Sequence, residues 1–294
     1  MTGERDAADG FDVTFVGRAN IDLTVRVPHR AGPGRTAAGS ALTTSPGGKS
    51  LNQAVATARL GGRARLVANV GADAWGHRIR AALTAVGVDT RHLTLIPDVT
   101  TGAAIIEVTP DGESYITLAP SPATELTTHD VQRVTTVDTR AVVVQLDLPP
   151  EPVAALLRHR PAPTVIGNLV LHADLDRTVL RHLDVLVVNQ HEADAILGAA
   201  TGDPLRAAEV LQRLGPPTVV VTAGPRGAAY THPHGSGTVP APTVPVVDTT
   251  GAGDAFLGSL ALDLARGTPL PEAVRGAVQV GSRAVAHSGA NTAS

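Results

Sequence analysis

The amino-acid sequence predicts an α/β protein with a mostly parallel central sheet flanked by helices. From Ala141 onward, short apolar runs typical of buried strands alternate with segments whose apolar residues recur at helical spacing, which is the rhythm of repeated strand–helix–strand units. Polar residues follow several of these runs, and α/β folds place their ligands at the carboxyl ends of strands. The 294 residues are enough to bury a large core.

The composition argues against several classes of function. A formal net charge of −3, with both signs mixed along the chain, gives no indication of a nucleic-acid or membrane partner. The absence of cysteine excludes disulfides, thiolate catalysis and cysteine-bound metals. Apolar runs stay below the ~18 residues of a membrane span, and residues 1–10 are charged and lack a signal-peptide core. We therefore expect a loose N-terminal tail and a cytoplasmic protein.

The apolar patterns place the expected strands and helices along the chain. The expected strands are Phe11–Val16, Leu23–Val27, Arg65–Val70, two runs within Thr101–Leu118, Val142–Leu146, Thr164–Ile166, Val185–Val188 and Thr218–Val221. Residues 245–247 are interpreted as the end of one more β segment. Helices are expected over about 50–60, over about 74–86 and from Ala255. Asp73 precedes the second of these helices and could either cap it or contact a ligand.

The most informative stretch is D-T-T-G-A-G-D-A-F, which covers residues 248–256. Its small residues form a turn that opens a helix, and the N–H groups at a helix N-terminus attract anions. Gly251, Ala252 and Gly253 leave room for a ligand to approach the backbone. Asp254 stands where an anion should bind. It could cap the helix, or it could act as a general base beside a phosphoryl group whose developing charge the N–H groups stabilise.

This stretch resembles the C-terminal signature of the ribokinase-like (PfkB) family of carbohydrate kinases. The resemblance implies phosphoryl transfer from ATP to a hydroxyl group, with Asp254 as the base and Gly251, Ala252 and Gly253 as the anion hole. It also implies a Rossmann-like three-layer sandwich that forms a single kinase domain over residues 1–294. A small β-sheet lid is expected from about 23–45 and 100–123. Such lids can pair between subunits, so a homodimer through the lid is an option.

A second motif, P-G-G-K-S-L-N-Q-A over residues 46–54, is similar to the substrate motif of the same family. It is not a P-loop, because a P-loop would need Gly where Thr43 stands and no buried strand precedes it. The resemblance assigns sugar binding to Asn20, Asp22, Gly48, Lys49, Asn52 and Asp147. Lys49 is the sole lysine among 24 Lys and Arg residues, which indicates a role that Arg cannot fill. Gln53 could simply be a solvated helix residue.

The resemblance also assigns nucleotide and metal sites. Asn189 and Glu192 match a motif that positions Mg²⁺ and phosphates, largely through water. The expected nucleotide contacts are Asn189, Thr222, Gly224, Arg226 and Gly227. Asp248, Thr250 and Gly289 match positions that hold a monovalent cation such as K⁺, mostly through backbone carbonyls. A NAD site is excluded because no G-x-G-x-x-G follows the first strand.

The sequence thus predicts an ATP-dependent sugar kinase whose acceptor is a pentose such as ribose. Proteins commonly hold nucleobases by aromatic stacking, worth ~1–3 kcal/mol per base, and this chain has three Phe, two Tyr and one Trp. Of these, Tyr115 in the expected lid is the one placed to reach a base. The Asn, Asp and Lys of the substrate motifs suit a small polyol. A nucleoside kinase, a sugar-phosphate kinase and a non-catalytic sugar or nucleotide sensor remain as alternatives.

Overall fold

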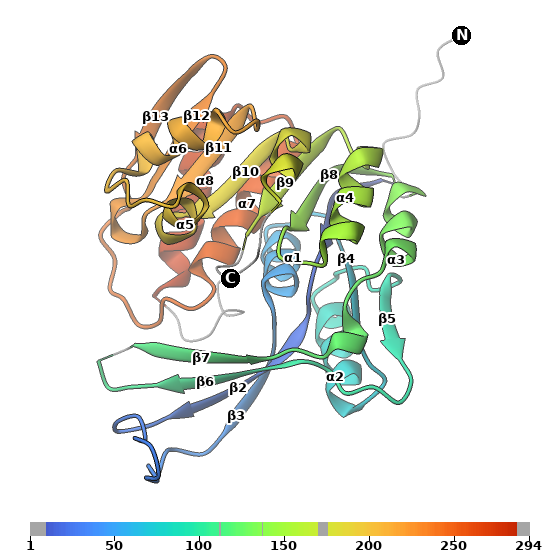
Figure 1. The fold of residues 1–294 in the computed structure, drawn as a ribbon, viewed down its shortest axis with the longest axis vertical. Coiled ribbons are helices and arrows are strands. Elements are labelled where there is room, and N and C mark those ends of the chain that lie inside the picture. Colours follow the sequence, from blue (N-terminus) through green and yellow to red (C-terminus); the bar gives the residue numbers. More distant parts are fainter. Residues whose placement is uncertain (1–9, 112, 137, 170–175, 287–294) are drawn as a thin grey trace.

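The computed structural model describes residues 10–111, 113–136, 138–169 and 176–286, which form a three-layer α/β sandwich with a smaller sheet attached (Figure 1). Within these ranges the central sheet has nine strands in the order β13-β12-β11-β10-β9-β8-β1-β4-β5. Its strands are β1 (Phe11–Val16), β4 (Ala64–Gly71), β5 (Leu93–Ile96), β8 (Thr139–Gln145), β9 (Thr164–Asn168), β10 (Val185–Asn189), β11 (Thr218–Thr222), β12 (Ala228–His232) and β13 (Gly235–Val239). All pairs are parallel except β11–β12 and β12–β13.

Helices cover both faces of this sheet. One face carries α1 (Lys49–Arg59), α2 (Ala74–Ala85), α7 (Ala252–Ala265) and α8 (Leu270–Ala284), and the other carries α3 (Thr128–Gln132), α4 (Pro150–His159), α5 (Gln190–Leu197) and α6 (Pro204–Gln212). Short 3-10 turns stand at Pro122–Thr124, Arg133–Thr136, Arg177–His182 and Gly224–Arg226. Alternate residues of a strand serve opposite faces: Val143 packs in the core that contains Phe256, while its neighbour Val144 packs in the core that contains Leu156.

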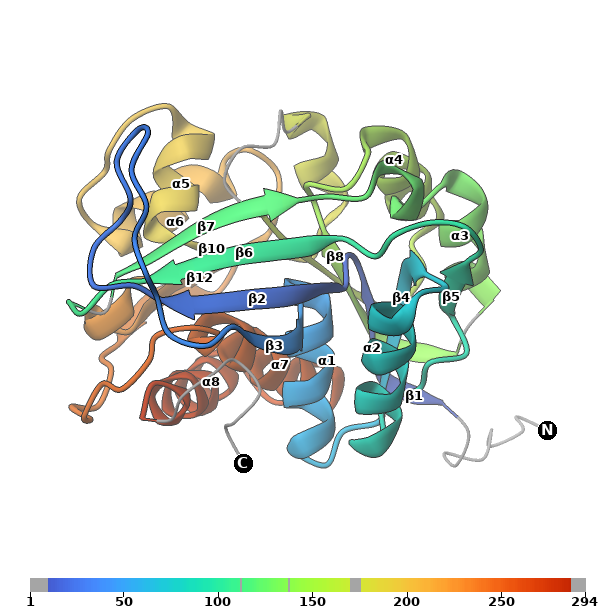
Figure 2. The same cartoon turned by 90° about the horizontal axis from the view of Figure 1, so that it is seen from below.

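The smaller sheet is the lid. It consists of β2 (Asn20–Arg26), β3 (Thr43–Gly47), β6 (Ala103–Val108) and β7 (Ser114–Ala119) in the order β3-β2-β6-β7. The β2–β6 pair is parallel, and the other two pairs are antiparallel. Residues 17–19 alone separate β1 from β2, so the lid joins the molecule where the strands of the central sheet end (Figures 1 and 2).

Most expected elements are confirmed, and three differences are informative. The strand expected from Leu23 begins earlier, at Asn20, which places Asn20 and Asp22 within the lid. Residues 245–247 form no strand: Pro240, Pro242 and Pro245 remove N–H donors from this segment, and Val246 and Val247 are 65% and 60% exposed. The β12–β13 hairpin was not expected.

Asp73 caps α2, because its side chain accepts a hydrogen bond from the Gly76 N–H at 2.8 Å. The same carboxylate also accepts the Thr101 N–H at 2.9 Å, from outside the helix. In the part of the chain that the structure describes, no helix combines the length and the apolar character needed to cross a bilayer.

Candidate active site

Asp254 lies in the first turn of α7, where N–H groups have no acceptor within the helix. Gly251 is the residue before this helix and has a φ of 79°. The Asp254 carboxylate is turned toward α1 rather than used as a cap: Asn52 Nδ2 donates to Oδ2 at 3.1 Å, and Gln53 Nε2 donates to Oδ1 at 3.0 Å. The carboxylate is therefore held at both oxygens by side chains of α1. At the start of α7 the Ala252 N–H donates to the Thr249 carbonyl at 3.3 Å.

Two aspartates of the site have raised pKa values. Burial raises the pKa of the Asp254 carboxyl, while the positive charge of Lys49 and the two amide donors act in the opposite direction. Burial also raises the pKa of Asp22, and the negative charge of Asp254 adds to this effect. The two carboxyl groups thus lie within each other's electrostatic field, although one belongs to the lid and the other to α7.

Asn20, Asp22 and Gly48 meet where the lid joins α1. Asn20 Nδ2 donates to Asp22 Oδ1 at 2.8 Å, and β2 pairs with β3 so that Asn20 lies opposite Gly47. Gly48 has a φ of 99°, and a Cβ there would stand 2.8 Å from both the Arg18 carbonyl and Asn20 Oδ1. A side chain at this position is excluded by conformation and by space. The structure therefore brings these three predicted sugar-site residues together, close to the start of α1.

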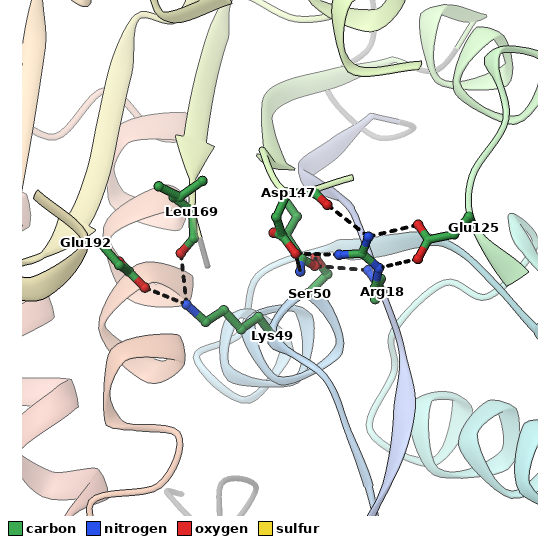
Figure 3. Close-up of polar contacts among 8 residues, drawn as sticks. Arg18, Lys49, Ser50, Glu125, Asp147, Leu169 and Glu192 are labelled. Atoms are coloured by element: carbon green, nitrogen blue, oxygen red, sulfur yellow. Dashed lines mark hydrogen bonds and ion pairs between the residues drawn. The ribbon is translucent and has the colours of Figure 1, made fainter. Parts of the chain in front are cut away.

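Lys49 bridges the sugar-binding motif and the Asn189–Glu192 motif. Its Nζ donates to Glu192 Oε1 at 2.9 Å and to the Leu169 carbonyl at 3.0 Å (Figure 3). Glu192 is buried, and its Oε2 accepts the Asn189 N–H at 2.8 Å in a capping box at the start of α5. Both oxygens of Glu192 thus have partners within the protein, and the charge of Lys49 is paired with this carboxylate.

Arg18 forms a second ion-paired cluster on the other side of the start of α1 (Figure 3). Its guanidinium binds Glu125 through two parallel hydrogen bonds of 2.7 and 2.9 Å and also contacts Asp147 Oδ2. Gln145 Nε2 donates to the same Asp147 oxygen at 3.2 Å. One oxygen of Asp147, a residue predicted to bind sugar, is therefore engaged by protein groups, while its Oδ1 is buried without a hydrogen-bond partner among the described residues. Arg18 and Glu125 were not singled out from the sequence, because no local motif marks them.

The predicted nucleotide contacts lie at the ends of two neighbouring strands. Asn189 at the end of β10 is directly opposite Thr222 at the end of β11. A 3-10 turn follows, in which Gly224 and Gly227 have φ values of 54° and 85°. The Arg226 side chain is exposed and donates to the Gly202 carbonyl at 3.1 Å. These residues form one edge at the carboxyl ends of the sheet.

The predicted metal positions are built from few carboxylates. The described ranges contain no group of three or more His, Cys, Asp or Glu side chains that could hold a metal ion. Mg²⁺ commonly keeps several waters and takes one or two protein carboxylates. Each oxygen of Glu192 has one protein partner and, as a carboxylate oxygen, could accept a further hydrogen bond from a metal-bound water. For the monovalent cation, Asp248 Oδ1 accepts the Thr250 N–H at 2.9 Å, while Gly289 lies outside the described residues.

Gln53 and Asn168 are site residues that the sequence did not reveal. Gln53 is 2% exposed, so its interpretation as a solvated helix residue is wrong. Its Nε2 reaches Asp254 from α1 and also lies 3.3 Å from Asn168 Oδ1. Asn168 ends β9, and the rule that polar residues at strand ends face ligands could have drawn attention to it.

This combination of an α/β sandwich, a β lid and a carboxylate at a helix N-terminus is the arrangement of a phosphoryl-transfer enzyme acting on a hydroxyl group. Residues 11–294 match the family described as pfkB family carbohydrate kinase, and the chain belongs to this family.

The chain is similar to several known members of the family. It is 32% identical to a ribokinase of Bacillus subtilis over 95% of this chain and 94% of that protein. It is 30% identical to a ribokinase of Haemophilus influenzae over 90% and 88%. Among solved structures, it resembles ribokinase from Thermotoga maritima with a TM-score of 0.86 and 27% identity, covering 96% of this chain and 95% of that one. It also resembles Arabidopsis thaliana ribokinase complexed with ribose and ATP, with a TM-score of 0.84 and 26% identity, covering 97% and 95%.

Proposed function

We propose that this carbohydrate kinase transfers the γ-phosphoryl group of ATP to a hydroxyl group of a free pentose, with ribose as the preferred acceptor. The observation that carries the proposal is the Asp254 carboxylate, held at both oxygens by α1 amides beside the N-terminus of α7. The ribokinases among its relatives, one of them solved with ribose and ATP, support the choice of acceptor.

In the proposed mechanism, Asp254 accepts the proton of the attacking hydroxyl. Its raised pKa makes it a better base than an ordinary carboxylate. The backbone N–H groups of Gly251, Ala252 and Gly253 stabilise the negative charge that develops on the phosphoryl group. Positioning and electrostatics of this kind supply most of the catalysis in phosphoryl transfer.

The acceptor is proposed to be held by Asn20, Asp22, Gly48 and Asn52. Asn52 donates to Asp254, while its Oδ1 has no partner among the described residues, so a sugar hydroxyl would satisfy it. Lys49 contributes by keeping Glu192 in place.

Thr222, Gly224, Arg226 and Gly227 are proposed to line the nucleotide, beside Asn189. Mg²⁺, held through water by Glu192, would neutralise phosphate charge when bound. Asp248, Thr250 and Gly289 would hold K⁺.

The charges around the site favour a neutral acceptor over a sugar phosphate. Arg18 is paired with Glu125 and Asp147, and Lys49 is paired with Glu192. The two aspartates nearest the acceptor, Asp22 and Asp254, already have pKa values raised by burial. A phosphate group on the acceptor would add negative charge beside cations that are already paired with carboxylates, which is unfavourable in a desolvated site.

The aromatic residues give little support to a nucleoside acceptor. Tyr115 lies on β7 with the Arg30 guanidinium 4.3 Å from its ring centre, and Phe256 is buried in the core. Aliphatic side chains can still sandwich a base, so a nucleoside kinase is the second candidate.

The decisive experiment compares kcat/KM for ribose, fructose, adenosine, cytidine and ribose 5-phosphate, with ADP release as the common readout. We expect ribose to have the highest value. A nucleoside or a sugar phosphate exceeding ribose by about tenfold, a difference of about 1.4 kcal/mol in transition-state binding, would overturn the choice of acceptor. Absence of ADP release with every acceptor would favour the sensor.

The two sheets are proposed to work as one kinase domain in the cytoplasm, with the lid closing over the acceptor. The lid also offers a surface for a second copy of the chain, because Ile116 and Leu118 on β7 are 57% and 63% exposed. We propose a homodimer through this surface, and its test is the molar mass in solution.

A further inference from the structure

The amide of Gln53 connects the proposed base to the central sheet. Gln53 lies on α1, and its Nε2 is 3.0 Å from Asp254 Oδ1 and 3.3 Å from Asn168 Oδ1. Asn168 at the end of β9 in turn donates from Nδ2 to the Val187 carbonyl of β10 at 2.9 Å. A continuous series of hydrogen bonds thus runs from the backbone of β10 to the carboxylate on α7.

The orientation of each side-chain amide in this series is fixed by its hydrogen bond to the preceding group. The Val187 carbonyl can only accept, so the Asn168 amide must present its NH₂ to β10 and its Oδ1 to Gln53. Gln53 must then present its NH₂ to Asn168. An ionised Asp254 also only accepts, and the NH₂ group has two hydrogens for two acceptors. A flipped Gln53 amide would place its oxygen against Asn168 Oδ1 and Asp254 Oδ1. These three oxygens would then lack a donor at this contact, which is costly at a buried position.

The distance between α1 and α7 is also fixed at this point. A Cβ on Gly258 of α7 would lie 2.7 Å from the Gln53 carbonyl oxygen of α1. Glycine therefore allows the two helix backbones to approach closely here. This approach brings the first turn of α7 within reach of the Gln53 side chain.

We propose that Gln53 is a positioning residue for the base: with Asn168 it fixes the orientation of the Asp254 carboxylate relative to the acceptor hydroxyl. The inference rests on the proposed function of Asp254. Asn52 binds the other oxygen of the same carboxylate but is also a proposed sugar contact. Gln53 is buried and bonds only to Asn168 and Asp254 among the side-chain contacts of the described residues. Its effect on the reaction must therefore pass through Asp254.

The experiment removes the amide NH₂ donor of Gln53 while keeping the size of the side chain. In Gln53→Met we expect kcat to fall by roughly 10- to 100-fold, because small misplacements of catalytic groups cost up to about 10² in rate, while the KM values for ribose and ATP change by less than about threefold. In Asn168→Ala, where Gln53 remains but is free to rotate, we expect a smaller loss of the same kind. If Gln53→Met does not fold, Asn168→Ala provides the test.

Thr57→Val is the matched control. Thr57 lies one turn further along α1, is buried, and also joins α1 to α7, through a 2.9 Å hydrogen bond from Oγ1 to the Gly258 carbonyl. We expect this variant to lose stability without losing kcat. An equal loss of kcat in Thr57→Val and Gln53→Met would assign both effects to helix packing and contradict the proposal.

A double-variant comparison separates this inference from the proposed function. In an Asp254→Asn background, Gln53→Met should produce little further loss of kcat, because residues that act through one group are not additive. If Gln53→Met lowers kcat in this background as much as it does in the wild type, the proposed role of Gln53 is contradicted. Full activity of Asp254→Asn alone would instead contradict the proposed function. Full activity of folded Gln53→Met, with Asp254→Asn impaired, would overturn the inference and leave the proposed function standing.

Discussion

Asp254 and Asp89 are carboxylates in the same molecule with opposite environments. Asp89 lies near the start of β4, where the Arg65 and Arg91 guanidinium groups bind its Oδ2 at 2.8 and 2.7 Å. Burial alone would raise the pKa of Asp89, but the hydrogen bonds and positive charges of Arg91 and Arg65 outweigh it and hold the pKa well below the ordinary value. Asp254 receives hydrogen bonds from neutral amides instead, and its pKa is raised.

The difference lies in the balance between burial and the groups around each carboxylate. Two guanidinium groups bind Asp89 and outweigh its burial, so they favour the ionised form and stabilise the fold. At Asp254 burial is the largest effect, and the charge of Lys49 and the two amides do not outweigh it, so the carboxylate keeps a raised tendency to take a proton. The region around Asp89, near the start of β4, therefore contributes to stability. The start of α7, which bears Asp254, is suited to proton transfer.

The largest expected effect is on catalysis at Asp254. Asp254→Asn keeps the size of the side chain but removes the proton acceptor, and loss of a general base typically lowers kcat by ~10²–10⁴. Relief of the buried charge favours the folded variant, but the new NH₂ group faces Asn52 or Gln53, which both donate here in the wild type. These two effects oppose each other, so the free energy of unfolding should change by less than about 2 kcal/mol. ADP release and chemical denaturation measure the two quantities. A variant that keeps wild-type kcat would remove Asp254 from the mechanism.

Asp89→Asn should have the opposite pair of effects, a loss of stability with an unchanged kcat. Arg65 is 6% exposed at its side chain, and removing the partner of a buried charge costs about 3–5 kcal/mol. We expect the free energy of unfolding to fall by about this amount, while kcat at a temperature below the new midpoint stays at the wild-type value. A loss of kcat in the folded variant would show that the two ends of the sheet are coupled.

The smallest expected effect is that of Arg91→Ala. The Arg91 side chain is 73% exposed, and exposed ion pairs contribute little to stability because water screens them. The free energy of unfolding should therefore change far less than in Asp89→Asn, with Arg65 still bound to Asp89. A loss as large as that of Asp89→Asn would mean that Arg91, and not the buried Arg65, stabilises the carboxylate.

Much of the fold follows from local patterns in the sequence, and less of the site does. Phe11–Val16 forms β1 with the bounds its apolar run predicts. The pattern failed at residues 245–247, where β-branched residues suggested a strand but neighbouring prolines prevent pairing.

At the site, the signature motif located Asp254 in the first turn of α7. It could not reveal that Gln53 holds the carboxylate or that Arg18 binds Asp147, because these partners lie 201 and 129 residues apart in the chain. Such contacts depend on how α1, α7 and the strand ends are brought together, which no local pattern encodes.

The roles of Asp254 as proton acceptor and of Asp89 as structural anion can be tested together by measuring kcat and the free energy of unfolding against pH. The base must be ionised, so kcat at saturating ribose and ATP should fall as the pH is lowered through the raised pKa of Asp254, above the ordinary value of about 3.9. The stability contributed by Asp89, whose pKa is lowered, should persist until the pH falls below about 3.9.

Asp254→Asn is the control for this measurement, because other charged groups interact electrostatically with Asp254. These groups are Lys49, Glu192 and Asp22. The residual activity of this variant should lack the acidic limb seen in the wild type. An identical acidic limb in both proteins, or a wild-type kcat that stays level until the fold itself loses stability, would contradict the role of Asp254 as the proton acceptor.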